Sequence, residues 1–443
     1  MIVAGRALAR ASTICLLLGL APAAGAEPEL RIPPIEPAPQ LTLDDAIREG
    51  LERNLTIVAE RYSIGVARAR AITARLRPNP VLTFSAMLPD PTVFAENISP
   101  REQVFRTDVV IERGDKRDRR IEVAEEARSV AERQLLNTIR TIVLDIESAF
   151  IDLVLAKQNL ALARESLQAF DVVVQVNVDR VRTGDLAQVE LTRSRLAALQ
   201  FQNDVRQQES KLVIARHRLK TLIGRTDGDA IDATGDLRHD TQAIDLETVR
   251  QSALRRRPDL EALRRDQARS AADLRLQIAQ GKVDYTISGE IHRQRQATPA
   301  DANMGFLYGV YLSTPLPLFN RNQGEIERAR QETSQVEARI RALEAEVSSE
   351  VQAAYSAYAA SRDIVNTIEA QMLAQARDVR STTEYSYRHG EASFVEFLDA
   401  VRAFNETMQS YNAARADYAR SLYVLESTAG TPIAALALQT VTP

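Results

Sequence analysis

Two long stretches of the chain combine helical apolar spacing with an absence of residues that break helices. Residues 115–183 and 325–389, runs of 69 and 65 residues, contain neither glycine nor proline. Ile142, Ile146 and Phe150 recur at intervals of four residues in the first run, which places their side chains on one face of a helix. At 1.5 Å per residue such runs predict helices of roughly 100 Å. The polar residues between these apolar positions are typical of the solvated face of a long coiled coil.

Four shorter segments alternate apolar and polar residues with a period of two. Tyr285, Ile287 and Ile291 alternate with polar residues in one of them. This pattern is typical of a β-strand with one apolar and one polar face. We expect such strands near residues 80–88, 103–112, 283–292 and 306–314. Strands of roughly 9–11 residues span a bilayer when tilted, but amphipathic strands of a soluble sheet have the same pattern.

The whole pattern occurs twice along the chain. Three pairs of segments align at shifts of 203 to 206 residues, beginning at Leu43 and Leu246, Ile121 and Ile326, and Gly184 and Gly390. A shift that drifts by so little indicates an internal duplication. We therefore expect a first structural repeat over residues 41–239, a second over 240–432, and a tail over 433–443.

The N-terminus predicts export from the cytoplasm. Arg6 and Arg10 precede a short apolar stretch, which ends in a small-residue cleavage pattern before residue 27. We interpret residues 1–26 as a secretory signal peptide that is cleaved, followed by a proline-rich segment over 27–40. Cys15 is the only cysteine, and the residue before it, Ile14, is not the small residue of a lipoprotein signal. No lipid anchor is expected.

Composition argues against an enzyme and against a nucleic-acid binder. The net charge is −4, with 56 basic and 60 acidic residues, whereas a generic nucleic-acid binder is strongly basic. The four histidines have no second ligand at a recognised metal-site spacing: His217, His239, His292 and His389. We find no glycine-rich phosphate loop and no nucleophile elbow in the sequence. We expect no catalytic residues, no metal site and no cofactor.

Four strands per chain are too few to close a barrel in a membrane. About eight strands are the minimum, and an open edge in lipid leaves backbone groups unpaired. If the strands are transmembrane, two or three copies must share one barrel, and their helices must associate around the same axis.

Three short motifs now support a resemblance to a known family. They are Arg77–Pro80 before the first strand, Arg113–Arg117 after the second, and Pro315–Gly324 after the fourth. Together with the leader, the duplication and the strand pairs, they resemble the TolC-like outer-membrane factors over about residues 41–432. The last motif is most similar to the CzcC-like branch, which is associated with export of divalent heavy-metal cations.

The resemblance implies a fold, partners and a location. The fold is mainly α with a β membrane section: long helical hairpins form a trimeric periplasmic α-barrel, and the three chains share a twelve-stranded outer-membrane β-barrel. The protein would be the exit duct of a tripartite efflux system. Its partners would be a periplasmic membrane-fusion adaptor and an inner-membrane pump of the resistance-nodulation-division type. Drug or solvent efflux is the alternative within the family, and a periplasmic coiled-coil scaffold is the alternative of another class.

The resemblance also implies site residues at the hairpin tips. The residues expected to dock the adaptor are Arg182, Gly184, Leu186, Ala187, Arg388, Gly390, Ala392 and Ser393. Glu396 and Asp399 match the positions where the family has an acidic constriction at the periplasmic mouth. Glu190 and Tyr387 match a pair that the family uses to hold the mouth closed by a bond across neighbouring helices. Without the resemblance these acids are ordinary surface charges.

Overall fold

Polar caps and glycine turns divide the chain into helices where the sequence pattern changes. The computed structural model describes residues 40–87, 102–225, 231–240, 244–295 and 304–431. The predicted signal peptide, nearly all of the proline-rich segment, most of both loops between paired strands and the tail lie outside these residues. The described residues belong to one packed unit.

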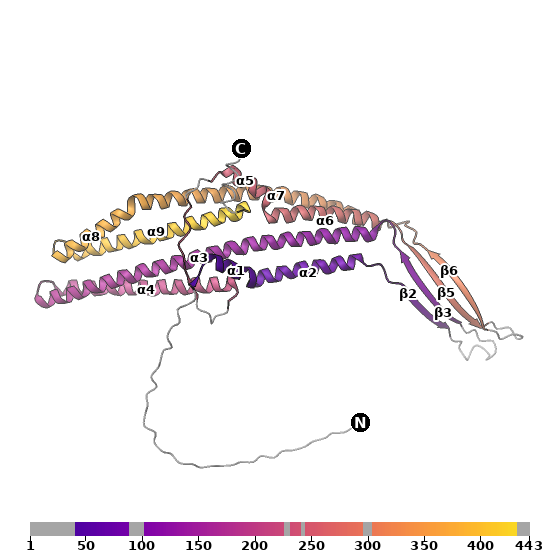
Figure 1. Cartoon of the computed structure of the whole chain (residues 1–443), viewed down its shortest axis with the longest axis horizontal. Helices are drawn as coiled ribbons and strands as arrows, with labels where there is room; N and C mark the ends of the chain where they lie inside the picture. Colours follow the sequence, from indigo (N-terminus) through magenta and orange to yellow (C-terminus); the bar gives the residue numbers. More distant parts are fainter. Residues whose placement is uncertain (1–39, 88–101, 226–230, 241–243, 296–303, 432–443) are drawn as a thin grey trace, which may run out of the picture. The chain divides into compact units, whose positions relative to one another are not determined.

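The elements come in the same order in both halves. The helices of the first half are α1 (Leu43–Arg53), α2 (Leu55–Arg75), α3 (Lys116–Thr183) and α4 (Gln188–Ile223). Those of the second half are α5 (Leu246–Arg256), α6 (Pro258–Gln280), α7 (Gln323–Thr367), α8 (Leu373–His389) and α9 (Phe394–Ala429). A π-helical turn, Ile368–Met372, joins α7 to α8 where the sequence pattern predicts an uninterrupted helix. The ribbon changes direction near this turn (Figure 1), as expected where one extra residue enters a helical turn.

Four strands form one antiparallel sheet. The strands are β2 (Val81–Met87), β3 (Glu102–Ile111), β5 (Tyr285–Arg295) and β6 (Met304–Ser313), and their order in the sheet is β2-β3-β5-β6. The two halves therefore meet at the β3–β5 pairing, where Thr107 lies opposite Gly289. Strands β2 and β6 are the two edges of this sheet. A separate two-stranded parallel pair joins β1 (Gln40–Leu41) to β4 (Asp232–Ala233).

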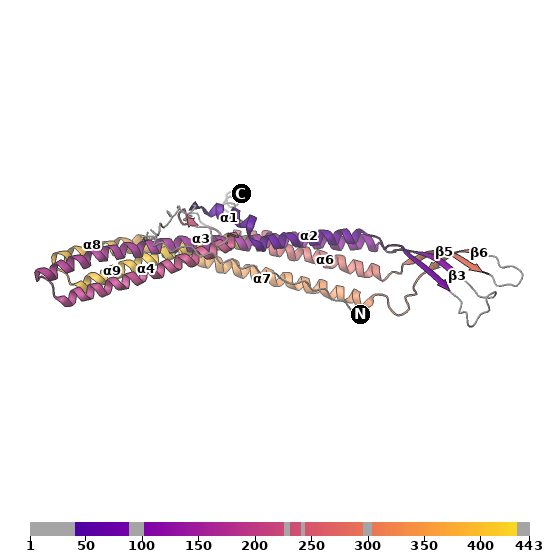
Figure 2. The same ribbon diagram turned by 90° about the horizontal axis from the view of Figure 1, so that it is seen from below.

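The helices next to the sheet repeat the order of the strands. Helix α2 packs on α3, α3 on α6, and α6 on α7, and Figure 2 shows α7 at one margin of this layer. The chain passes from α2 into β2 and from β6 into α7, so the edge strands and the edge helices lie at the same two margins. Helix α2 leaves large apolar side chains exposed, among them Tyr62 and Ile72 at 73% and 64%. Helix α2 therefore presents an apolar surface at one margin of the unit.

At the opposite end the chain forms two helical hairpins, α3–α4 and α8–α9 (Figure 1). Helix α3 has 68 residues, a length of roughly 100 Å. Most of its buried residues lie in the half that packs against α4 and α9, including Ile146 and Phe170 at 0% and 1% exposure. The predicted combination of long helical hairpins with a four-stranded β-section is confirmed.

Candidate functional site

Each hairpin turns at a glycine in the left-handed backbone region. The φ angle is 86° at Gly184 and 81° at Gly390, a conformation that is free of strain only for a residue without a side chain. In both turns the backbone N–H of the residue after the glycine donates to a carbonyl oxygen of the preceding helix at 2.8 Å. The N–H of Asp185 donates to Arg180, and the N–H of Glu391 donates to Ser386. This closure satisfies carbonyl groups at the helix end. The two turns have the same local geometry although their sequences differ.

The residues predicted to dock a partner lie at these turns. Arg182 pairs with Asp179 at 3.4 Å, and Arg388 pairs with Glu384 at 2.6 Å, in each case within one helix. Ala187 and Ser393 are exposed, while Leu186 and Ala392 are half-buried. The turns therefore present small side chains beside guanidinium groups that already have a carboxylate partner.

An aromatic cluster joins the two hairpins next to the turns. Its rings are those of Phe170, Phe201, Tyr387, Phe394 and Phe397. The ring centroids of Phe170 and Phe201 are 4.8 Å apart, and those of Tyr387 and Phe397 are 5.1 Å apart. Aromatic pairs at such distances stabilise by about 0.5–1.5 kcal/mol beyond the area that they bury. Sequence reasoning identified only Tyr387; the spacing of Phe394, Phe397 and Val401 after the turn was the available signal for the rest.

The bonding partner expected for Tyr387 is not the one found. Its hydroxyl donates to Oδ1 of Asn177 at 2.7 Å, and both side chains are buried. Glu190, the expected partner, instead accepts from Arg193 at 2.9 Å. Burial raises the pKa of Tyr387, so the hydroxyl keeps its proton at neutral pH. The bond connects α3 to α8 and therefore links the two hairpins of one chain.

The carboxylate of Glu396 is bound to its own helix. It accepts from the N–H of Ser393 at 2.7 Å, while the Ser393 hydroxyl accepts from the N–H of Glu396 at 3.3 Å. This capping box satisfies N–H groups at the start of α9, and the bond from the Ser393 N–H lowers the pKa of Glu396. Glu190 has no equivalent, because Ala187 at the start of α4 has no side-chain oxygen. Asp399 is exposed, as is Glu396, one helical turn away.

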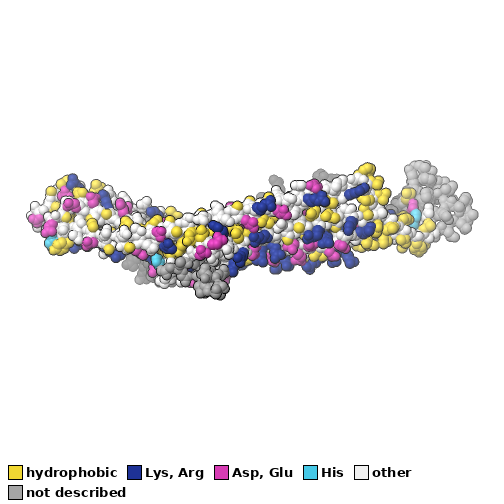
Figure 3. Space-filling view, turned by 90° about the horizontal axis from the view of Figure 1, so that it is seen from above, with side chains coloured by type: hydrophobic (Ala, Val, Ile, Leu, Met, Phe, Trp, Pro, Cys, Tyr) yellow, Lys and Arg dark blue, Asp and Glu magenta, His cyan; other side chains and the backbone are white. Residues whose placement is uncertain are grey.

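The sheet has an apolar face and a polar face. One row across the apolar face runs Phe84, Phe105, Ile291 and Tyr308, and Figure 3 shows hydrophobic side chains gathered at the strand end of the molecule. On the other face Arg106 donates to Asp108 at 2.8 Å and to the hydroxyl of Ser288 at 3.0 Å. His292 pairs with Glu102 on the same face. The predicted alternation of apolar and polar positions is confirmed, and the carboxylates of Asp108 and Glu102 on the polar face are paired with Arg106 and His292.

Comparison with known proteins decides the family. The model of the family described as outer membrane efflux protein matches residues 46–225 and 249–431, which is most of the chain. The chain belongs to this family.

The chain is similar to known proteins in sequence and in fold along nearly its whole length. The cobalt-zinc-cadmium resistance protein CzcC of Cupriavidus metallidurans is 24% identical over 378 residues, covering 85% of this chain and 87% of the relative. Nodulation protein T of Rhizobium leguminosarum bv. trifolii is 21% identical, and the match covers 88% of this chain and 85% of the relative. A crystal structure of CusC superposes with a TM-score of 0.73 at 16% identity, and the match covers 89% of this chain and 93% of the CusC chain. The family match and the paired amphipathic strands leave no support for the scaffold alternative.

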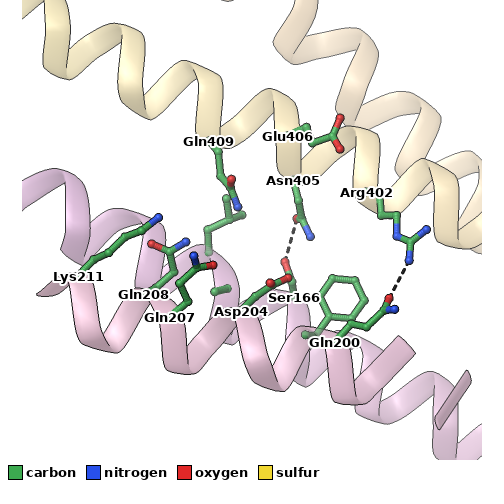
Figure 4. A pocket seen from close by; sticks show the side chains of 13 residues that line it. Ser166, Gln200, Asp204, Gln207, Gln208, Lys211, Arg402, Asn405, Glu406 and Gln409 are labelled. Atoms are coloured by element: carbon green, nitrogen blue, oxygen red, sulfur yellow. Dashed lines mark hydrogen bonds between the residues drawn. The ribbon is translucent and has the colours of Figure 1, made fainter. Parts of the chain in front are cut away.

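This efflux protein has a polar groove that sequence reasoning did not identify. It lies between α3, α4 and α9, with a volume of about 340 Å³. In Figure 4 side chains of α4 and α9 face one another across it, and Ser166 donates to Oδ1 of Asn405 at 2.9 Å. Arg402 donates to Oε1 of Gln200 at 2.8 Å. These bonds bridge the hairpins at a second level beyond the aromatic cluster.

The described residues contain neither a membrane-spanning helix nor a ready metal site. No helix in the described ranges has the length and apolarity to cross a membrane. No group of three or more histidine, aspartate or glutamate side chains in the described part of the chain is arranged to hold a metal ion.

Proposed function

We propose that three copies of this outer membrane efflux protein form the exit duct of a tripartite efflux system, and that the duct passes divalent heavy-metal cations. The observation that carries the proposal is the open sheet. It has two unpaired edges, an apolar face for lipid and a polar face for the duct. Three such sheets supply twelve strands, enough to close a barrel without leaving backbone groups unpaired in lipid.

The proposed cargo is supported by the relative CzcC, whose name refers to resistance to cobalt, zinc and cadmium. Glu290 on the polar face would attract cations in a narrow aqueous duct. Drug or solvent efflux through a duct of the same family is the second candidate.

We propose that the hairpin tips are the periplasmic mouth and that they meet the adaptor, which connects the duct to a resistance-nodulation-division pump. Glu396 and Asp399 would repeat around the threefold axis as a ring of exposed acids. Tyr387 would hold the mouth closed together with Asn177, with Glu190 nearby. The strand end would lie in the outer membrane, reached after cleavage of the signal peptide and without a lipid anchor.

Deletion and complementation test the cargo. The deleted strain should become sensitive to zinc, cobalt or cadmium and keep its resistance to hydrophobic drugs, and the wild-type gene should restore growth. Drug sensitivity without metal sensitivity would transfer the assignment to the second candidate. An unchanged growth profile for both classes would remove the proposal of efflux in that organism.

Docking at the tips is tested with Gly390→Trp. The left-handed φ of 81° strains any side chain at this position, and the indole would occupy the surface proposed for the adaptor. Export should be lost while trimers still assemble in the membrane. The matched control is Gly235→Trp, at an exposed glycine that also has a positive φ, 130°, and where an added Cβ would meet no neighbouring group within 4 Å. Normal export by Gly390→Trp would contradict docking at this tip.

A further inference from the structure

The segment between β6 and α7 presents three large apolar side chains to solvent. Leu316 is 73% exposed, Leu318 67% and Phe319 90%. The segment is nevertheless held in place: the amide of Gln323 donates to the carbonyl oxygen of Phe319 at 3.1 Å, and Arg321 donates to that of Pro317 at 3.2 Å. Exposed apolar side chains on an ordered segment are typical of a contact surface.

A groove lies at the opposite margin of the same unit. It has a volume of about 700 Å³, and its lining combines apolar residues, Pro78, Pro80 and residues 109–111, with charged ones, Arg77, Glu112, Asp115, Lys116, Arg117 and Asp118. The groove exists because β2 begins only at Val81, opposite Asp108 of β3. Proline has no N–H to donate to a neighbouring strand, so the pairing stops at Pro80. Residues 109–111 of β3 therefore have β5 on one side and this groove on the other.

Closure of a ring brings the segment and the groove together. Neighbouring strands in this sheet are antiparallel, so β6 of one copy and β2 of the next run in opposite directions. The end of β6 then lies beside the start of the next β2. From Ser313 to Phe319 the chain reaches at most about 20 Å. The next copy's β3 is two strand spacings away, about 10 Å, and is within that reach.

We propose that Phe319, with Leu318 beside it, seats in the groove between residues 77–80 and 109–118 of the neighbouring copy. The inference rests on the proposed trimer and assigns a contact within it. Arg77 and Arg117 line the groove, and guanidinium groups pack favourably against an aromatic face. The groove volume is in the range of pockets that hold drug-sized molecules, so it has room for both side chains. The contact would seal the junction between the strand section and the helical section.

A cysteine pair tests the contact. In a Cys15→Ser background, Phe319→Cys is combined with Asn79→Cys in the full chain expressed in membranes. Oxidation should convert most of the protein to disulfide-linked dimers and trimers on denaturing gels. The matched control places the second cysteine at Thr56, an exposed residue at the other end of α2, and should stay monomeric. Glutaraldehyde treatment of the wild-type protein reports the trimer independently of this contact.

The outcomes separate the two claims. Trimers with glutaraldehyde but no disulfide would overturn the seated Phe319 and leave the duct intact. Monomers in both experiments would overturn the trimer and this inference together. A bimane label on Phe319→Cys distinguishes lipid as the alternative occupant: quenching by nitroxide-labelled phospholipid would overturn the proposal. Phe319→Asp should make trimers dissociate at a lower temperature in detergent, and Phe319→Leu should restore the wild-type value.

Discussion

Removing one hydroxyl from the buried bond between the hairpins should open the proposed mouth. Tyr387→Phe keeps the ring, so its stacking on Phe397 at 5.1 Å is retained and only the 2.7 Å bond to Asn177 is lost. The change leaves Oδ1 of Asn177 without its donor, and Nδ2 of the same side chain already has no partner among the described residues. Leaving a buried polar group unpaired costs about 1–3 kcal/mol. If the bond exists only in the closed mouth, the closed state loses that amount, a shift of roughly 5- to 150-fold toward the open state.

The assay is single-channel recording of purified trimers in planar bilayers. Tyr387→Phe should raise the ratio of open to closed time by a factor within that range, and the mean conductance should rise with it. Tyr385→Phe is the matched control, because this tyrosine lies two residues earlier on the same helix and is 62% exposed. Glu190→Ala should have a smaller effect than Tyr387→Phe, because Glu190 pairs with Arg193 and not with the tyrosine.

A double-mutant cycle provides the refutation. Replacing both partners by apolar groups of similar shape is often nearly neutral, so Tyr387→Phe with Asn177→Leu should close the mouth again in part. The bond does not hold the mouth closed if Tyr387→Phe behaves like Tyr385→Phe, or if the effects of Tyr387→Phe and Asn177→Leu simply add without coupling.

Three further predictions concern selectivity, membrane insertion and pH. Glu396→Ala with Asp399→Ala should weaken cation selectivity and block by multivalent cations; unchanged reversal potentials in salt gradients would show that these acids do not line the mouth. Phe84→Lys, on the apolar face, should destabilise the membrane-inserted barrel by about 2–4 kcal/mol and reduce heat-modifiable trimers in outer-membrane fractions. Its control, Ser85→Lys on the polar face, should assemble normally. Burial, together with the nearby carboxylate of Glu426, raises the pKa of Glu147 from 4.5 to about 8. A carboxyl group whose pKa is raised by folding favours the folded state at low pH, and this stabilisation is lost progressively as the pH rises from about 4.5 to about 8. Glu147→Gln should therefore raise the melting temperature at pH 8 and change it little at pH 4. Equal shifts of the melting temperature at both pH values would contradict the assignment.

Local pattern was sufficient to predict the long helices, the four strands of the larger sheet and the two hairpin turns. Runs without glycine or proline correspond to α3 and to α7–α8, since no residue in them opposes helix formation. The alternation of Ile287 and Ile291 with polar residues correctly assigned a two-faced strand. The capping box of Ser393 and Glu396 was also readable, because its two residues are three apart in the chain. Glu396 was nevertheless interpreted from the sequence as a pore acid or an ordinary surface charge, and the capping signal was overlooked.

Contacts between distant segments were decided only by the tertiary structure. Asn177 and Tyr387 are 210 positions apart, and no local pattern marks Asn177 as different from other polar residues of α3. The pairing of β3 with β5 joins the two halves of the chain, and it leaves β2 and β6 as the free edges on which the proposed trimer depends. The groove beside Pro80 likewise requires β2 to stop short of the base of β3. Propensity and periodicity act over a few residues, whereas these features depend on which surfaces come together when apolar faces are buried.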